Sequence, residues 1–286
     1  MSIIRILSAT SLLLLLQPSS LTASLVITAY RDQAVYVASD SLVSGLDGTP
    51  QSQAKKTFRL GDTCLVSWTG LSRLAPTNKV SQATDPVLSM DVALEKLCRD
   101  CNSGREPLTT QRDLILRGIT EQYRDCMRWA MSNGVSPNDL NSQVLERTLS
   151  FAGYDPSTKA FFHQTYYFQG TNEVSGKTVF NFGPNLNGAS VGFQGEYHFL
   201  AALVYGHDKK LAELCSEKYR RDIGELLAPQ TAIPEQRLLD CFLEMFRLHK
   251  QHASQLGYDK GAIGEPYVVY KVTTQEITQI AGGHAQ

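Results

Sequence analysis

The sequence has no surplus of charge of either sign. Its 27 lysines and arginines nearly balance its 28 aspartates and glutamates, so the formal net charge is −1. Nucleic-acid-binding proteins usually carry a basic surplus, and the balance therefore argues against a nucleic-acid partner. Hydrophobic residues make up 42% of the 286 residues, which is ordinary for a globular protein and allows one large domain with a substantial core.

Metal-ligand spacing is also missing. The six histidines are scattered, with no HxxxH pair or similar spacing. Cys98 and Cys101 form a CxxC, but it lies on a predicted helix without the second cysteine pair or nearby histidines that a zinc site would need. We therefore expect no metal site. Cys215 and Cys241 lie on apolar faces of predicted helices, either as buried thiols or as one bridge between helices.

Apolar runs of membrane-spanning length are absent after residue 23, whereas residues 1–23 contain a shorter one. Arg5 is the only charge there, Ile6–Leu16 is apolar with five consecutive leucines, and "QPSSLTA" follows. This order is typical of a secretory signal peptide. The run is too short to span a bilayer comfortably, and an uncleaved membrane anchor is the alternative. We expect a secreted or periplasmic protein with no membrane association once the leader is removed.

The end of the leader favours cleavage after Ala23, because the residue before the cut should be small. Cleavage after Leu21 or Thr22 fits this rule less well. Ser24 would then be the first residue of the mature chain. No linker-like or low-complexity stretch divides residues 24–286, so we expect a single domain there.

Short strands and helices are expected in alternating blocks along residues 24–286. β-Branched runs separated by turn residues predict strands, and apolar residues at helical spacing predict helices. The predicted strands are 24–30, 34–41, 55–62, 63–70, 148–155, 160–170, 177–183 and a pair within 265–280. The predicted helices are 86–101, 110–134, 137–147, 196–206, 209–228 and 234–257, the first with Asp85 as cap and Pro86 in its first turn. This order favours an α+β domain with segregated layers over a βαβ alternation.

Four residues in the first strands suggest hydrolytic chemistry. If processing exposes Ser24, its own α-amine titrates near neutrality and can accept the hydroxyl proton, directly or through water. A lysine such as Lys56, kept positive, would favour the alkoxide and hold the amine neutral. Asp40 would hold that lysine in place. The backbone amide of Gly70, at a strand end, could stabilise an oxyanion.

The segments "SLVITAYRDQAVYVASDS", "KKTFRLGD" and "SWTGL" resemble proteasome β-type subunits, within the N-terminal-nucleophile (Ntn) hydrolase superfamily. In that family a nucleophile opens the first strand, an acid followed by Ser closes the second, a lysine begins the third and a glycine ends the fourth. The intervals here are sixteen residues from Ser24 to Asp40, sixteen from Asp40 to Lys56 and fourteen from Lys56 to Gly70. All three agree with the family pattern.

The resemblance implies a four-layer αββα sandwich and a catalytic set of Ser24, Asp40, Lys56 and Gly70. Thr22 is the rival for the nucleophile, which is usually threonine in the family, but it would need two extra residues before Asp40. Lys55 is the rival for Lys56; strand alternation points only one of them inward, and the spacing selects Lys56.

The resemblance weakens in its supporting segments. In "VGFQGEYHFLAAL", which is similar to the family's glycine-rich turn, Phe193 or Gln194 occupies the position of a serine near the nucleophile. In "AIGEPYVVYKV", Ala262 or Ile263 occupies a second serine position and Gly264 matches a family glycine. The helical region at about 80–147 is longer than the family's helix pair.

Together with the predicted leader, the resemblance implies an exported threonine/serine-type Ntn peptidase or amidase. It would act through an acyl-enzyme on Ser24 and need no metal or organic cofactor. Its substrate would be a peptide or an acyl amide. Two alternatives stay open: a catalytically inactive structural or binding protein, and an acylase for small amides. A homo-oligomer is a further possibility, because assembly depends on surfaces that a single sequence does not reveal.

Overall fold

The structure is a computed structural model, and the statements below concern the residues that it describes. These are residues 24–44, 50–70, 73–74, 88–104, 106–132, 148–169, 173–182, 190–195, 197–204, 209–214, 223, 233–258 and 263–282. The predicted leader, Thr22, the predicted helix 137–147, Cys215 and Ala262 all lie outside them.

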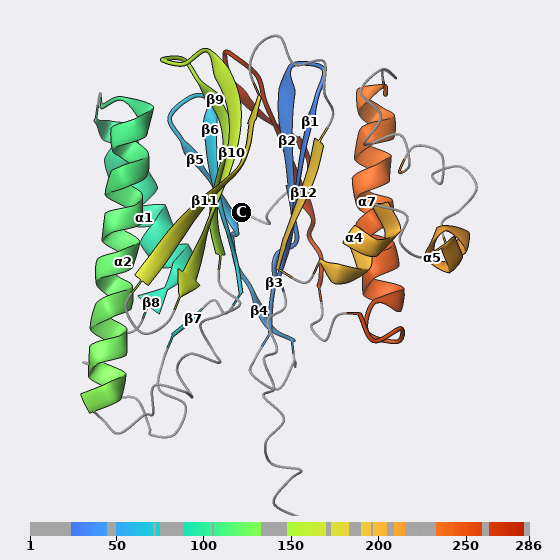
Figure 1. The fold of residues 1–286 in the computed structure, drawn as a ribbon, viewed down its shortest axis with the longest axis horizontal. Coiled ribbons are helices and arrows are strands. Elements are labelled where there is room, and N and C mark those ends of the chain that lie inside the picture. Colours follow the sequence, from blue (N-terminus) through green and yellow to red (C-terminus); the bar gives the residue numbers. More distant parts are fainter. Residues whose placement is uncertain are drawn as a thin grey trace, which may run out of the picture.

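Two five-stranded antiparallel sheets form the centre of the molecule (Figure 1). The first sheet contains, in spatial order, β12 (Ser190–Gly195), β1 (Leu25–Arg31), β2 (Ala34–Ser39), β13 (Val268–Val272) and β14 (Ile277–Ala281). The second contains β11 (Glu173–Phe182), β10 (Ala160–Gln169), β9 (Thr148–Asp155), β6 (Cys64–Thr69) and β5 (Thr57–Leu60). Two short pairs join β3 (Leu42–Ser44) to β4 (Pro50–Gln53) and β7 (Arg73–Leu74) to β8 (Leu88–Ser89).

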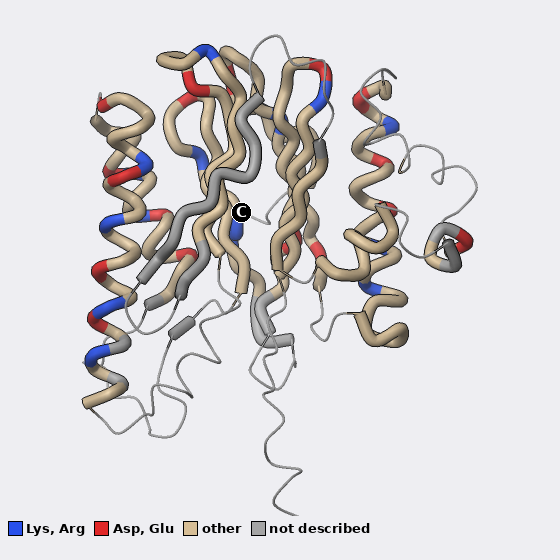
Figure 2. The backbone as a smooth tube through the Cα atoms, in the orientation of Figure 1, with Lys and Arg blue, Asp and Glu red and all other residues tan. Residues whose placement is uncertain are grey.

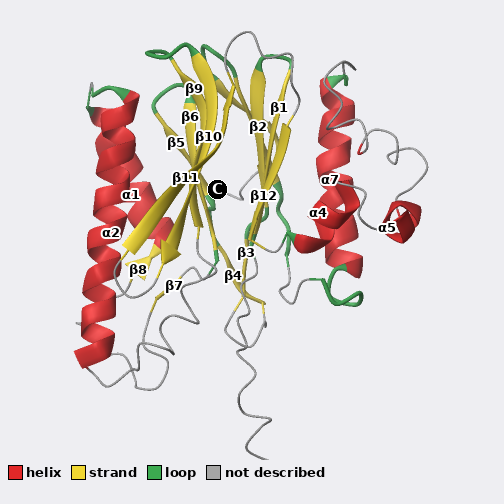
Figure 3. Cartoon of the chain, in the orientation of Figure 1, coloured by secondary structure: helices red, strands yellow, loops and turns green. Residues whose placement is uncertain are grey.

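Helices lie outside the sheets on both sides (Figure 3). Beside the second sheet lie α1 (Met90–Ser103) and α2 (Leu108–Ser132), and beside the first lie α4 (His198–Val204) and α7 (Glu235–His252), with α5 (Lys209–Leu214) farther out. None of the described helices is long and apolar enough to cross a membrane.

Three apolar clusters hold these layers together, and β1 contributes to two of them. Leu25, Ile27 and Ala29 belong to the cluster that includes α4 and α7. Val26 and Tyr30, which alternate with them, join Ala152, Phe161 and other residues between the sheets. A third cluster packs α1 and α2 against the second sheet. Because successive strand residues face opposite sides, one strand can serve two interfaces. The arrangement is compatible with the predicted αββα sandwich.

Most predicted elements are confirmed within a few residues, including the strands 148–155 and 160–170 and the long helix in 110–134. The predicted start of the first helix is wrong: Leu88–Ser89 is strand β8, paired with Arg73–Leu74, and α1 begins only at Met90. The segment "SVGFQG", interpreted from sequence as part of a turn, is strand β12 beside β1. Two glycines lower the strand propensity of this segment, so its sequence did not indicate a strand.

Candidate active site

Asp40 follows the last residue of β2, and its buried carboxylate accepts four hydrogen bonds. Oδ1 accepts from the Leu25 amide at 2.8 Å and from Lys56 Nζ at 2.7 Å. Oδ2 accepts from the amides of Leu42 at 3.2 Å and Gly264 at 3.3 Å. An ionised carboxylate is an acceptor only, with about four lone-pair positions, so this donor set suits the charged form of Asp40.

Lys56 lies just before β5, and its side chain and that of Asp40 have no solvent exposure. Its ammonium also donates to the Leu42 carbonyl oxygen at 2.6 Å. Burial lowers the pKa of Lys56, and the adjacent Asp40 carboxylate opposes that shift. The Lys56 carbonyl is fixed in turn, because it accepts from the Trp68 amide of β6 at 3.0 Å. Buried ion pairs need such additional hydrogen bonds to offset the loss of water.

Charged residues otherwise lie mainly on the helices and at the ends of strands (Figure 2). Along α2, acidic and basic residues alternate, as on a solvated helix face. A fully buried Lys–Asp pair is therefore exceptional among the described residues, and such a pair is a candidate for a functional site.

Ser24 lies next to this pair, immediately before β1. It is buried, and its hydroxyl is 3.4 Å from the Gly70 carbonyl oxygen. The following residue, Leu25, exchanges two hydrogen bonds with Asp40, because its carbonyl also accepts from the Asp40 amide at 3.2 Å. Gly70 has φ of +97°, a backbone conformation that favours glycine. Ser24 and Gly70 therefore meet, and Asp40 ties the start of β1 to Lys56.

The two lysines just before β5 have opposite environments. Lys56 is buried against Asp40, whereas Lys55 is exposed, with its Nζ 5.0 Å from the centre of the Phe58 ring. The lysine that contacts Asp40 is therefore Lys56, the one that the family spacing selected.

The supporting segments contain groups that sequence reasoning did not assign. Gly264, noted only for its resemblance to a family glycine, donates its amide to Asp40. Phe193 packs with the helix-side cluster of the first sheet, whereas Gln194 is buried among polar residues of the second sheet. The Leu42 carbonyl that accepts from Lys56 had no sequence signal at all, because any residue supplies a backbone carbonyl.

Hydroxyl groups also connect the two sheets one residue away from the ion pair. Thr57, which follows Lys56, donates its hydroxyl to that of Ser39, which precedes Asp40, at 3.1 Å. The Thr57 hydroxyl is also 3.0 Å from that of Ser67 on β6. These bonds satisfy buried polar groups that would otherwise destabilise the sheet interface, and they hold Asp40 and Lys56 at a fixed separation.

Among the described residues, no group of three or more His, Cys, Asp or Glu side chains could hold a metal ion. Cys98 and Cys101 are buried on α1, and burial raises the pKa of Cys98 to about 12. Cys241 is buried in the helix-side core of the first sheet.

Gly195, the last residue of β12, brings that strand close to Ser24. Its φ is +81°, and a Cβ there would lie 1.9 Å from the Ser24 carbonyl oxygen and 3.2 Å from Thr69 Cβ. We expect Gly195→Ala to displace Ser24 and to lower any Ser24-dependent rate by about 10²-fold, as small misplacements at reacting centres do. Enzyme assays and urea unfolding would measure both effects.

Gly257→Ala is the matched control, because Gly257 has a similar φ of +73° but nothing within 4 Å of the added Cβ. In the control, the free energy of unfolding should fall by only about 1–2 kcal/mol, the cost of placing a residue with a Cβ at positive φ. In Gly195→Ala, the free energy of unfolding should fall by about 1–3 kcal/mol more than in the control, because backbone atoms must move to admit the Cβ. Equal losses in the two variants would contradict the close approach of β12 to Ser24.

Comparisons with known proteins give little beyond this geometry. No protein-family model matches the chain, and no curated protein matches it. Among solved structures, the chain is similar to "Anbu (ancestral beta-subunit) from Yersinia bercovieri", with a TM-score of 0.48 and 14% identity over 90% of this chain and 86% of that one. These values are too low to transfer a function, so the proposal below rests on the contacts of this chain.

Proposed function

We propose that the chain is the precursor of an exported Ntn hydrolase with a proteasome-like αββα fold, which cleaves amide bonds through an acyl-enzyme on Ser24. The observation that carries the proposal is the buried Lys56–Asp40 pair. Asp40 also binds the amide of Leu25, so the pair is anchored to the residue that follows Ser24. Stability alone does not explain a buried ion pair, because apolar residues of similar volume often stabilise a fold equally well or better.

In the proposed reaction, removal of residues 1–23 gives Ser24 a free α-amine. The amine takes the proton of the Ser24 hydroxyl while Oγ attacks the amide carbonyl carbon of the substrate. The carbonyl oxygen becomes an oxyanion, which the Gly70 amide stabilises; one such donor contributes about 10²–10³ to kcat in other hydrolases. The protonated amine then passes its proton to the leaving nitrogen. Water, deprotonated by the same amine, then attacks the acyl carbon, and the amine returns that proton to Oγ as the C–Oγ bond breaks and the acid leaves.

Lys56 and Asp40 set the charge around this reaction. The ammonium of Lys56 favours a negative charge developing on Oγ and disfavours protonation of the nearby α-amine, which keeps that amine available as a base. Asp40 fixes Lys56 at 2.7 Å and balances its charge. The substrate is a peptide or another acyl amide, and the reaction needs no metal or organic cofactor.

The mature N-terminus tests the proposal. The full-length chain, expressed in a host that exports it, should be cleaved after Ala23, so that intact-mass and N-terminal peptide analysis give a chain beginning at Ser24. Ala23→Leu should block this cut, because the residue before a signal-peptidase site must be small. This variant should then be inactive while its Ser24 is unchanged.

A mature chain that begins elsewhere, or an exported chain that keeps its leader, would contradict the proposal. Asp40 and Lys56 would then have no nucleophile with a free amine beside them. A structural or binding role would be the better account of the fold.

A further inference from the structure

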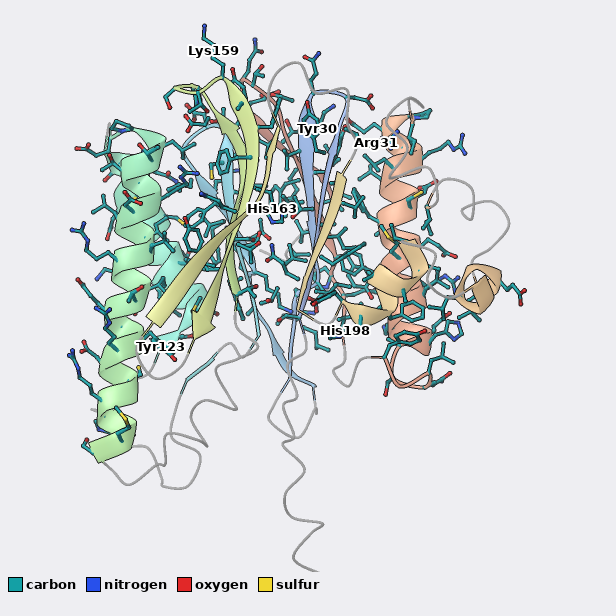
Figure 4. The ribbon with its side chains drawn as sticks, in the orientation of Figure 1. Tyr30, Arg31, Tyr123, Lys159, His163 and His198 are labelled. Atoms are coloured by element: carbon teal, nitrogen blue, oxygen red, sulfur yellow. The ribbon has the colours of Figure 1, made fainter. Side chains whose placement is uncertain are left out.

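A buried polar network near Ser24 has no part in the reaction described so far. Gln194 of β12 is its centre, and the other members are Thr69, Thr148, His163 and Thr165. All five side chains are buried. Gln194 belongs to the first sheet and the other four to the second, so the network crosses the space between the sheets; Figure 4 shows His163 there, near the centre of the molecule.

The hydrogen bonds of the network form a directed chain. Thr148 Oγ1 donates to Gln194 Oε1 at 3.4 Å, so in the 2.6 Å contact between the two threonine hydroxyls Thr69 is the donor. Gln194 Nε2 donates to His163 Nε2 at 2.8 Å and to Thr165 Oγ1 at 3.2 Å. His163 Nε2 must therefore be unprotonated, with the ring proton on Nδ1.

The neutral state of His163 agrees with its surroundings. Burial lowers the pKa of His163 to about 4. The ring also fits tightly, because a Cβ on Gly192 of β12 would lie 3.1 Å from His163 Cε1. The tight fit of the ring and the hydrogen bond from Gln194 Nε2 place His163 where it accepts from the Gln194 amide.

The position of this network matters because Ser24 and Gly70 belong to different sheets. Ser24 precedes β1 of the first sheet, and Gly70 follows β6 of the second. Their separation is therefore set by contacts that cross between the sheets. The Lys56–Asp40 pair is one such contact, and the Gln194 network is another. At one end of the network, Gln194 precedes Gly195, whose backbone approaches the Ser24 carbonyl. At the other end, Thr69 precedes Gly70.

We infer that Gln194 is a positioning residue, which holds β12 and the adjoining start of β1 against Thr69 and thereby sets the distance between the Ser24 hydroxyl and the Gly70 amide. The inference rests on the proposed function, because it assigns Gln194 a role in that reaction. His163 acts through Gln194 by fixing the orientation of its side-chain amide. Neither side chain needs to touch the substrate.

Gln194→Met tests the inference, because methionine keeps the length and loses every side-chain hydrogen bond of Gln194. The processed protein is treated with a β-lactone that acylates serine nucleophiles, and intact mass gives the maximal acylation rate and the half-saturating concentration. We expect the maximal rate to fall about 10²-fold, as misplaced reacting groups do, with half-saturation changed less than about threefold because substrate contacts remain.

Gln164→Met is the matched control, since Gln164 precedes Thr165 on β10 but contacts Arg112 of α2 at 2.9 Å, on the other face of the sheet. Its rate of acylation should lie within about twofold of wild type, because the hydrogen bonds of Gln164 with Arg112 and Tyr166 do not involve the Gln194 network. If Gln194→Met does not fold, Thr148→Val removes only the hydroxyl that links Gln194 to Thr69. That variant should lose about tenfold in the maximal rate, the usual effect of one hydrogen bond.

Suppose that the wild type reacts and that Gln194→Met is acylated at a rate within about twofold of it. That result would overturn the positioning role and leave the proposed function intact. Where Gln194→Met does not fold, the same result for Thr148→Val would overturn that role in the same way. A variant whose melting temperature falls while its rate per folded molecule stays unchanged would also overturn it, because the network would then be structural only. A processed wild type that the probe does not acylate would overturn the proposed function and this inference together.

Discussion

Ser24→Ala should abolish amide hydrolysis by the processed chain, with kcat lowered at least about 10⁴-fold, as when other hydrolases lose a serine nucleophile. The variant keeps the α-amine, Lys56 and Asp40, so only the attacking oxygen is lost. The folded state should hardly change, because the Ser24 hydroxyl makes a long contact of 3.4 Å with the Gly70 carbonyl. Steady-state kinetics on peptide and acyl-amide substrates would measure the effect, and urea unfolding would confirm the stability.

Ser24→Thr is the informative partner variant, because threonine presents the same β-hydroxyl. It should retain activity within about tenfold of wild type, since the nucleophile and its base keep their chemistry. Both variants must first be shown by mass spectrometry to be cut after Ala23. Full activity in the processed Ser24→Ala protein would place the nucleophile elsewhere.

Lys56→Met should have a second large effect, on stability as well as on rate. It leaves the Asp40 carboxylate buried without its cation, and breaking one partner of a buried pair destabilises a protein by about 3–5 kcal/mol. The three backbone amides that remain on Asp40 should keep the loss near the lower end of that range. The rate should fall about 10³-fold, comparable to the loss of other fixed electrostatic contacts at reacting centres. Urea unfolding and single-turnover kinetics would separate the two effects.

Lys55→Met is the control for Lys56→Met, because it makes the same substitution at the preceding, exposed lysine. The substitution removes a cation–π contact with Phe58 at an exposed side chain, so stability should change by less than about 0.5 kcal/mol and the rate should not change. If the two variants lost stability equally, the Lys56–Asp40 pair would not have the energetic role that its burial implies.

Ser24, Asp40, Lys56 and Gly70 were singled out from sequence as candidates, and the case for them rested on the resemblance of the first strands to the proteasome β-type family, whose intervals they match. Asp40 and Lys56 are sixteen residues apart and come from different sheets, yet the pattern placed them together. The contacts around them were less accessible. Gly264 is 224 residues from Asp40 in sequence, and no local pattern relates a backbone amide to so distant a carboxylate.

Long-range pairing also explains the main errors in the predicted fold. Strand β12 contains two glycines and is stabilised by its pairing with β1, about 165 residues earlier. Strand β8 displaces the predicted start of α1 because it pairs with β7. Local propensity pointed to a helix at β8, and the family resemblance pointed to a turn at β12; tertiary pairing decided both segments.

The most direct test of the proposed mechanism is to find the acyl group on the enzyme during turnover. The processed wild type is quenched in acid while it hydrolyses an acyl-amide substrate, then digested and analysed by mass spectrometry. The N-terminal peptide beginning with Ser24 should gain the acyl group in exchange for the hydroxyl hydrogen, and the peptide from Ser24→Ala should not. Turnover without an adduct on Ser24, or with an adduct on another residue, would contradict the proposed role of Ser24.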